Sequence, residues 1–175
     1  MNKKPVPGSW SRLALFGTMA LAGSGCDLKT KAWAEQVLPA HPEGTLSVVE
    51  PWVELTLAYN HGTAFSVVPN MGSGTFLFGV FALILAAGLL ATILFTRVGR
   101  LEALALGTIA GGGIGNGIER LAGTGVVDFI KVNYPWGGSW PLFNVADVLI
   151  VVGVALLFLL PKNKKKREPS GAPAS

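Results

Sequence analysis

The run Phe76 to Phe95 restricts the fold of this sequence more than any other feature. It reads FLFGVFALILAAGLLATILF, and its only polar side chain is Thr92. A helix that crosses the hydrocarbon core of a bilayer needs about 20 mostly apolar residues. Charged residues make up 14% of the chain, whereas about 25% is usual in soluble domains. The sequence therefore predicts an integral membrane protein.

Three further segments are apolar enough to join this run in a membrane. Leu142–Leu160 has the length that a membrane span requires, and Leu101–Ile118 is apolar but rich in glycine. Leu13–Cys26 is too short by itself and reaches the required length only if the segment is extended. We expect four spans at roughly 11–33, 75–96, 101–120 and 142–160. The expected fold class is an all-α membrane protein with four transmembrane helices and a small extracytoplasmic β-rich subdomain, all within one domain at 1–160.

The basic residues predict how these spans are oriented. Most of the 14 Lys and Arg residues fall before the first span, between the second and third, or after the fourth. Under the positive-inside rule this places both termini in the cytoplasm. The basic run at 162–167 follows a span directly, so it is better explained as an anchor near anionic lipids than as a nucleic-acid site. We expect 161–175 to be a disordered basic tail.

The remaining segments, 34–74 and 121–141, are expected on the outer side. Within them, 45–68 and 123–141 are rich in Val, Thr and aromatic residues, which is typical of short strands. Isolated strands are marginally stable, so we expect the two segments to pair. Trp52, Trp136 and Trp140 suit either a membrane interface or packing within this subdomain, and the sequence favours neither.

Several polar residues lie where a membrane protein should avoid them. Asn116 and Arg120 end the third span, Asp128 follows it, and Asn144 and Asp147 begin the fourth. Ionisable groups inside a membrane are costly, so each is a candidate for function. Their common depth favours a site over an ion pathway. The structural alternative is a buried ion pair between Arg120 and an aspartate that only joins helices; the functional alternative is a small transporter or channel subunit.

Two aspartates held close together have a specific chemistry. They resist ionising together and share a proton. The ionised carboxylate can take a proton from water, while the protonated one can polarise a carbonyl and donate to the leaving amine. Such a pair hydrolyses a peptide bond without a metal or cofactor. No Gly-x-Ser-x-Gly motif supports a serine mechanism, and His41 and His61 are too far apart in sequence to suggest a metal cage.

Short motifs containing these residues resemble, in order, the blocks of one family, signal peptidase II, the bacterial lipoprotein signal peptidase. The blocks are DLKTK at Asp27 and Lys31, NHGTAFS at Asn60 and Gly62, GNGIER at Asn116 and Arg120, VVDF at Asp128, and FNVAD at Asn144 and Asp147. One departure is Glu119, which stands where the family usually has Asp.

The resemblance implies an activity and roles for these residues. Asp128 and Asp147 would be the catalytic pair of an aspartic endopeptidase. The residues that would support the site or bind substrate are Asn60, Gly62, Asn116, Arg120, Asn144 and Asp27. The enzyme would sit in the bacterial inner membrane among its lipids and cleave diacylglyceryl-modified prolipoproteins before the lipidated cysteine, without metal or cofactor. Globomycin would inhibit it. The family fold is similar too, with four transmembrane helices and a small β-cradle.

The stretch MALAGSGCDLKTK, at 19–31, also resembles a processing signal, with small residues before Cys26. A lipid-modified or secreted protein with a cleaved N-terminus is therefore a further alternative. However, Gly23 stands where a lipobox has a large aliphatic residue, and removal of this helix would reverse the charge distribution. Asp27 and Lys31 fit a retained helix that ends beside the active site. We expect Cys26 to be a membrane-embedded packing residue, neither lipidated nor catalytic.

Overall fold

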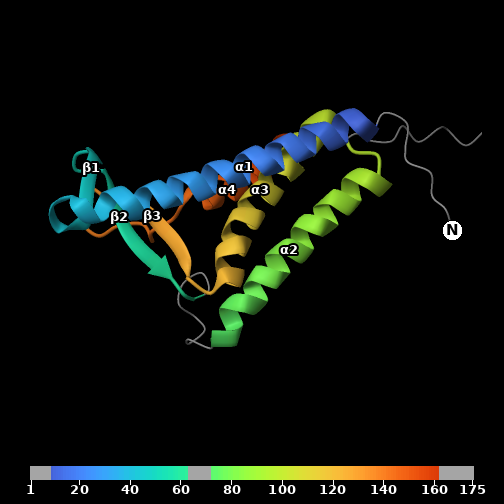
Figure 1. Cartoon of the computed structure of the whole chain (residues 1–175). Coiled ribbons are helices and arrows are strands. Elements are labelled where there is room, and N and C mark those ends of the chain that lie inside the picture. Colours follow the sequence, from blue (N-terminus) through green and yellow to red (C-terminus); the bar gives the residue numbers. More distant parts are fainter. Residues whose placement is uncertain (1–8, 63–71, 162–175) are drawn as a thin grey trace, which may run out of the picture.

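A computed structural model describes residues 9–62 and 72–161. Four helices form most of this part of the chain, and a small sheet lies at one end of them (Figure 1). The helices are α1 (Ser9–Val37), α2 (Gly72–Phe95), α3 (Arg100–Ala122) and α4 (Val145–Leu159); the strands are β1 (Thr45–Val49), β2 (Val53–Asn60) and β3 (Val126–Val132). Two short 3-10 turns, Leu38–Ala40 and Pro42–Gly44, connect α1 to β1.

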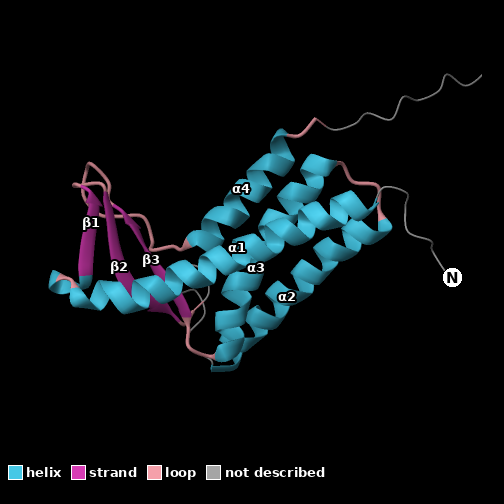
Figure 2. Cartoon of the chain, turned by 45° about the horizontal axis from the view of Figure 1, so that its top comes forward, coloured by secondary structure: helices cyan, strands magenta, loops and turns pink. Residues whose placement is uncertain are grey.

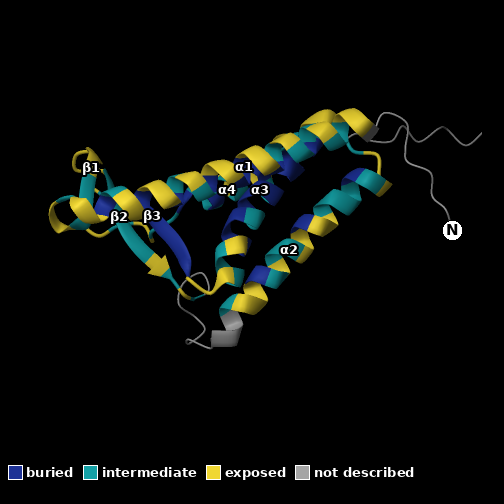
Figure 3. Ribbon diagram, in the orientation of Figure 1, coloured by how far each residue is buried: buried dark blue, intermediate teal, exposed yellow. Residues whose placement is uncertain are grey.

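The helices differ in how well each is suited to a bilayer. Of the described residues, one helical stretch, Thr75–Phe95, is long and apolar enough to cross a membrane by itself, with a mean hydropathy of 2.6. Val145–Leu159 is apolar but shorter. Many exposed apolar side chains lie on α2 and α4, and Figure 3 marks the exposed residues along α2 in yellow. The four predicted helices are confirmed; that all four cross the membrane stays a prediction.

Helix α3 lies at the centre of the bundle and packs against the other three (Figure 2). Its glycines make this close packing possible. A Cβ at Gly111 would lie 3.0 Å from the carbonyl oxygen of Ala20 in α1, and a Cβ at Gly107 would meet the backbone of Phe16. The four-residue spacing of Gly107, Gly111 and Gly115 is typical of such close helix contacts.

The sheet is antiparallel, with strand order β1-β2-β3. The predicted pairing of the two outer segments is confirmed where it is described, since Ala58 pairs with Asp128 and Val53 with Val132; residues 63–68 lie outside the described chain. Buried side chains join the sheet to the C-terminal end of α1, namely Ala34, Leu38, Val127 and Phe129. This contact fixes β3, and Asp128 with it, relative to the helices.

Two expectations about the helices were wrong. Helix α4 begins at Val145, because Phe143 still pairs with Ile130 of β3, whose N–H donates to the Phe143 carbonyl at 2.9 Å. Asp147 consequently lies in the first turn of α4. Cys26 is exposed on α1, so it does not pack within the protein.

Candidate active site

Asn144 is the residue that links the two predicted catalytic aspartates. It is the N-cap of α4, where its Oδ1 accepts a hydrogen bond from the Asp147 N–H at 3.1 Å. Its own N–H donates to Asp147 Oδ2 at 3.1 Å, which completes a reciprocal capping box. Its Nδ2 donates to Asp128 Oδ1 at 2.7 Å. One fully buried residue, through its side-chain amide and its backbone N–H, therefore brings a strand carboxylate and a helix carboxylate to the same place.

Asp128 is held on its other side by β2. Its Oδ2 accepts from Asn60 Nδ2 at 3.1 Å, and Asn60 Oδ1 accepts from the Gly62 N–H at 3.1 Å. Burial raises the pKa of Asp128, and the nearby charge of Asp147 raises it further, whereas the hydrogen bond from Asn60 lowers it. The predicted roles of Asn60 and Gly62 thus have a geometric basis: the glycine N–H orients the amide that contacts Asp128.

Asn116 holds Asp147 from α3. Its Nδ2 donates to Asp147 Oδ1 at 2.9 Å. Its Oδ1 accepts from Lys31 Nζ at 2.8 Å and from Asn144 Nδ2 at 3.1 Å. Because both donors approach the amide oxygen, the amide nitrogen must face Asp147. The orientation of Asn116 therefore depends on a lysine from α1.

Lys31 is buried, with a relative exposure of 1%, and its ammonium has three partners. It forms ion pairs with Asp27 Oδ2 at 2.8 Å and Glu119 Oε2 at 2.6 Å, in addition to its hydrogen bond with Asn116. The ammonium thus lies between two carboxylate counter-ions and one amide oxygen that accepts its hydrogen bond. Two carboxylates offset the cost of burying this charge.

Asp27 connects the same cluster to α4. Its Oδ1 accepts from the Ala146 N–H at 2.8 Å, in the first turn of that helix. A carboxylate is favoured there by the unpaired N–H groups and the helix dipole. Asp27 therefore contacts the first turn of the helix that carries Asp147.

Lys31 and Glu119 were not among the site residues predicted from the sequence. The signal for Lys31 was present, because it follows Asp27 by one helical turn, which places the two opposite charges on one helix face. Glu119 gave no such signal, since its partner comes from a distant helix. Its Oε2 also accepts from the Val127 N–H at 3.4 Å, so it contacts the strand that carries Asp128.

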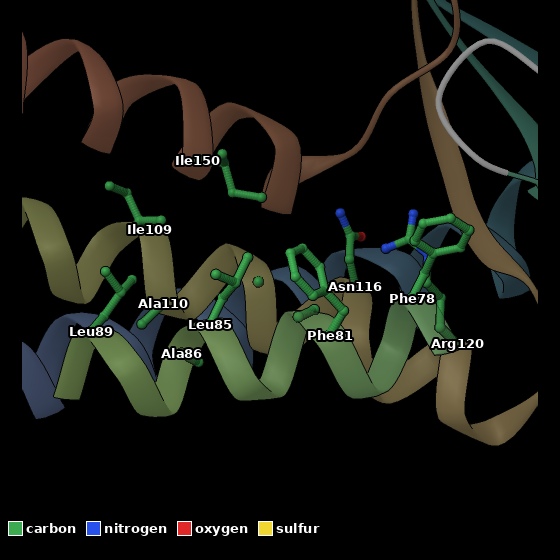
Figure 4. Close-up of a pocket in the computed structure, with 12 residues that line it drawn as sticks. Phe78, Phe81, Leu85, Ala86, Leu89, Ile109, Ala110, Asn116, Arg120 and Ile150 are labelled. Carbon is green, nitrogen blue, oxygen red and sulfur yellow. The ribbon is translucent and has the colours of Figure 1, made fainter. Parts of the chain in front are cut away.

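The position of Arg120 differs from the one expected if it formed a helix-joining ion pair with an aspartate. Within 9–62 and 72–161, it forms no ion pair, and the buried cation beside the carboxylates is Lys31. Arg120 instead lines an apolar cavity of about 410 Å³ between α2, α3 and α4. Figure 4 shows Asn116 and Arg120 at one end of this cavity and apolar side chains such as Leu89 and Ile109 at the other.

Comparison with known proteins identifies the family to which this arrangement belongs. Residues 19–161 match the family model for signal peptidase (SPase) II. The chain belongs to the signal peptidase II family. A lipoprotein signal peptidase of Dichelobacter nodosus is 33% identical to it, over 90% of this chain and 99% of that one. Another from Pseudomonas putida is 36% identical, over 94% and 96% of the two chains.

Solved structures share the fold of this signal peptidase. A bacterial membrane enzyme determined at 2.3 Å resolution superposes with a TM-score of 0.69 and 22% sequence identity, covering 99% of this chain and 100% of that one. A second, at 1.9 Å resolution, gives a TM-score of 0.68. The resemblance of the sequence motifs to this family is thus confirmed over most of the chain.

The pairing of Glu119 with Lys31 predicts how this signal peptidase responds to changes at position 119. Glu119→Gln removes one of the two charges that balance the buried ammonium, and should lower the free energy of unfolding by about 3 kcal/mol. Glu119→Asp keeps the charge but shortens its reach, and should cost about 1 kcal/mol. Thermal unfolding in detergent micelles measures both. Equal losses for the two variants would contradict a role for the charge.

Proposed function

We propose that this signal peptidase is an aspartic endopeptidase that removes the signal peptide of lipid-modified prolipoproteins, with Asp128 and Asp147 as its catalytic pair. The observation that carries the proposal is the position of Asn144, whose side-chain amide donates to the Asp128 carboxyl group and whose backbone N–H donates to the Asp147 carboxyl group. The names of the curated relatives, lipoprotein signal peptidases, support the class of substrate. In this mechanism the pair activates a water molecule for attack on the peptide carbonyl.

The surroundings of the two carboxyl groups support different roles for them. Asp147 lies in the first turn of α4, where the helix dipole favours a negative charge. Burial raises the pKa of Asp128, which favours its protonated form. Asp147 then takes the proton from the attacking water, and Asp128 polarises the carbonyl and later donates a proton to the leaving amine.

The apolar cavity supports a substrate that carries acyl chains. It lies against α2, and its polar end is formed by Asn116, which is hydrogen bonded to Asp147. In the proposed complex the acyl chains of a diacylglyceryl-cysteine occupy the cavity, and the scissile bond before that cysteine lies at the catalytic pair. Arg120, at the same end, donates to a carbonyl or ester oxygen of the substrate. Burial of the acyl chains supplies much of the binding energy.

The proposed setting is the bacterial inner membrane, with four spans, both termini in the cytoplasm and the catalytic pair near the outer face. The basic residues support this orientation. The exposed apolar surfaces of α2 and α4 support contact with lipid acyl chains. A transporter or channel is not supported by the family match.

The direct test uses purified enzyme in detergent and a prolipoprotein with or without the diacylglyceryl group. We expect cleavage immediately before the cysteine in the acylated substrate only, and inhibition by globomycin. Cleavage of both substrates at equal rates would argue against a lipid-binding role for the cavity. Cleavage that needs a reactive serine, detected by loss of activity with a serine-directed reagent, would contradict the aspartic mechanism.

The pH profile of cleavage provides a test of the role of Asp128. Since Asp128 must be protonated to act as the acid, activity should fall as pH rises through its raised pKa. The hydrogen bond from Asn60 lowers this pKa by stabilising the ionised carboxylate. Asn60→Leu removes the donor, so the alkaline limb of kcat/KM should move to higher pH. A limb that stays in place or moves to lower pH would contradict this assignment.

A further inference from the structure

The end of the sheet farthest from Asn60 forms an ordered surface that the peptidase reaction does not use. It consists of the turn between β1 and β2 and the loop that follows β3. The Asn133 N–H donates to the Trp52 carbonyl at 2.8 Å, and Asn133 Nδ2 donates to the Pro51 carbonyl at 2.9 Å. The Trp140 N–H donates to the Val132 carbonyl at 2.8 Å. These hydrogen bonds hold the turn and the loop together.

This surface exposes an unusual group of aromatic rings. The relative exposures are 42% for Trp52, 80% for Trp136 and 54% for Trp140. The ring of Trp136 stacks on Tyr134, with a centroid separation of 5.3 Å. Exposed apolar clusters of this kind mark contact surfaces, and Trp and Tyr are enriched where a membrane meets water.

A concavity of about 550 Å³ lies beside these rings, with Trp52 and Tyr134 on its wall. It also contains Glu54 and Lys131, whose side chains pair at 2.9 Å and remain 27% and 33% exposed. The concavity thus presents one negative and one positive charge next to aromatic faces. Such faces attract an ammonium group, and a lysine ammonium binds phosphate as a point charge.

The position of this surface relative to the helices is compatible with the headgroup layer. β3 is the strand nearest the helical bundle (Figure 2). The loop after it carries Trp136 and Trp140 and then leads into α4 at Val145. The rings of Trp136 and Trp140 therefore belong to the segment that joins the sheet to an apolar helix.

We propose that this surface, made of Trp52, Glu54, Lys131, Tyr134, Trp136 and Trp140, binds the headgroup of a zwitterionic phospholipid, phosphatidylethanolamine, in the outer leaflet. Lys131 receives the phosphate, while Glu54 and the rings of Trp52 and Tyr134 receive the ammonium. Trp136 and Trp140 lie among the neighbouring headgroups. Because Lys131 and Asp128 are on the same strand, this contact fixes the depth of the catalytic pair relative to the outer leaflet.

The first test measures the depth of one ring. The variant retains Trp136 as its single tryptophan and carries the substitutions Trp10→Phe, Trp33→Phe, Trp52→Phe and Trp140→Phe. It is reconstituted into vesicles of phosphatidylethanolamine and phosphatidylglycerol. Lipids brominated near the headgroup should reduce its emission about twofold, and aqueous iodide should have little effect. Quenching by iodide and not by the brominated lipid would overturn the proposal. A matched variant that retains Trp10 as its single tryptophan, at the N-terminal end of α1, controls for reconstitution.

The second test addresses the headgroup. In vesicles with phosphatidylethanolamine, the KM of the wild-type enzyme for an acylated substrate should be about threefold lower than in phosphatidylglycerol alone. Glu54→Gln combined with Lys131→Met should remove this difference and leave kcat unchanged. A variant that keeps the difference would overturn the headgroup assignment. Neither test depends on which carboxyl groups catalyse. The headgroup proposal can therefore fail while the proposed mechanism holds.

Discussion

Asp128→Asn or Asp147→Asn should each reduce cleavage of an acylated prolipoprotein by at least about a thousandfold, because general acid and base catalysis together carry the reaction. Both changes keep the shape of the side chain and remove its ability to exchange the proton. The two aspartates act as a unit, so the double variant should be scarcely less active than either single variant. The initial rate of signal-peptide release measures the effect.

Two controls separate this loss from misfolding. Each variant should still insert into membranes and remain folded in detergent, as judged by thermal unfolding. Glu43→Gln, at an exposed carboxylate in the turn before β1, should leave the rate unchanged. Near-wild-type processing by either aspartate variant would reject the assignment of the catalytic pair.

Lys31→Met should be the most destabilising single change at the site. It leaves the buried carboxylates of Asp27 and Glu119 without their common counter-ion, and loss of one partner from a buried ion pair costs about 3–5 kcal/mol. Activity should fall too, because the Asn116 amide loses the donor that orients it toward Asp147. Lys29→Met, at an exposed position on the same helix, should change stability by less than about 0.5 kcal/mol.

A second variant distinguishes charge balance from simple loss of packing. Adding Glu119→Gln to Lys31→Met removes one of the two unbalanced carboxylates, so it should restore part of the lost stability. The same Glu119→Gln change in the wild-type background should destabilise, as predicted above. If the two effects have the same sign, the network of Lys31 is not electrostatic in origin.

Much of the fold could be predicted from local patterns in the sequence. The apolar run at 76–95 determines α2 because its length and purity suit a membrane and little else. The strands at 45–49 and 53–60 follow from their Val, Thr and aromatic content. The spacing of Gly107 and Gly111 is typical of a helix that packs closely against a neighbour, as α3 does. The choice of Asp128 and Asp147 followed from charge placed where a membrane protein should avoid it.

What the tertiary structure decided is how these residues contact one another. Lys31 and Asn116 are 85 residues apart in the sequence, and only the packing of α1 against α3 brings them together. The start of α4 at Val145 depends on β3, because the Phe143–Ile130 pairing competes with the first helical turn. Arg120 faces the apolar cavity while Lys31 meets the carboxylates. Sequence periodicity determines the faces of single helices, whereas these contacts depend on the distances between helices, which the packing of the whole bundle sets.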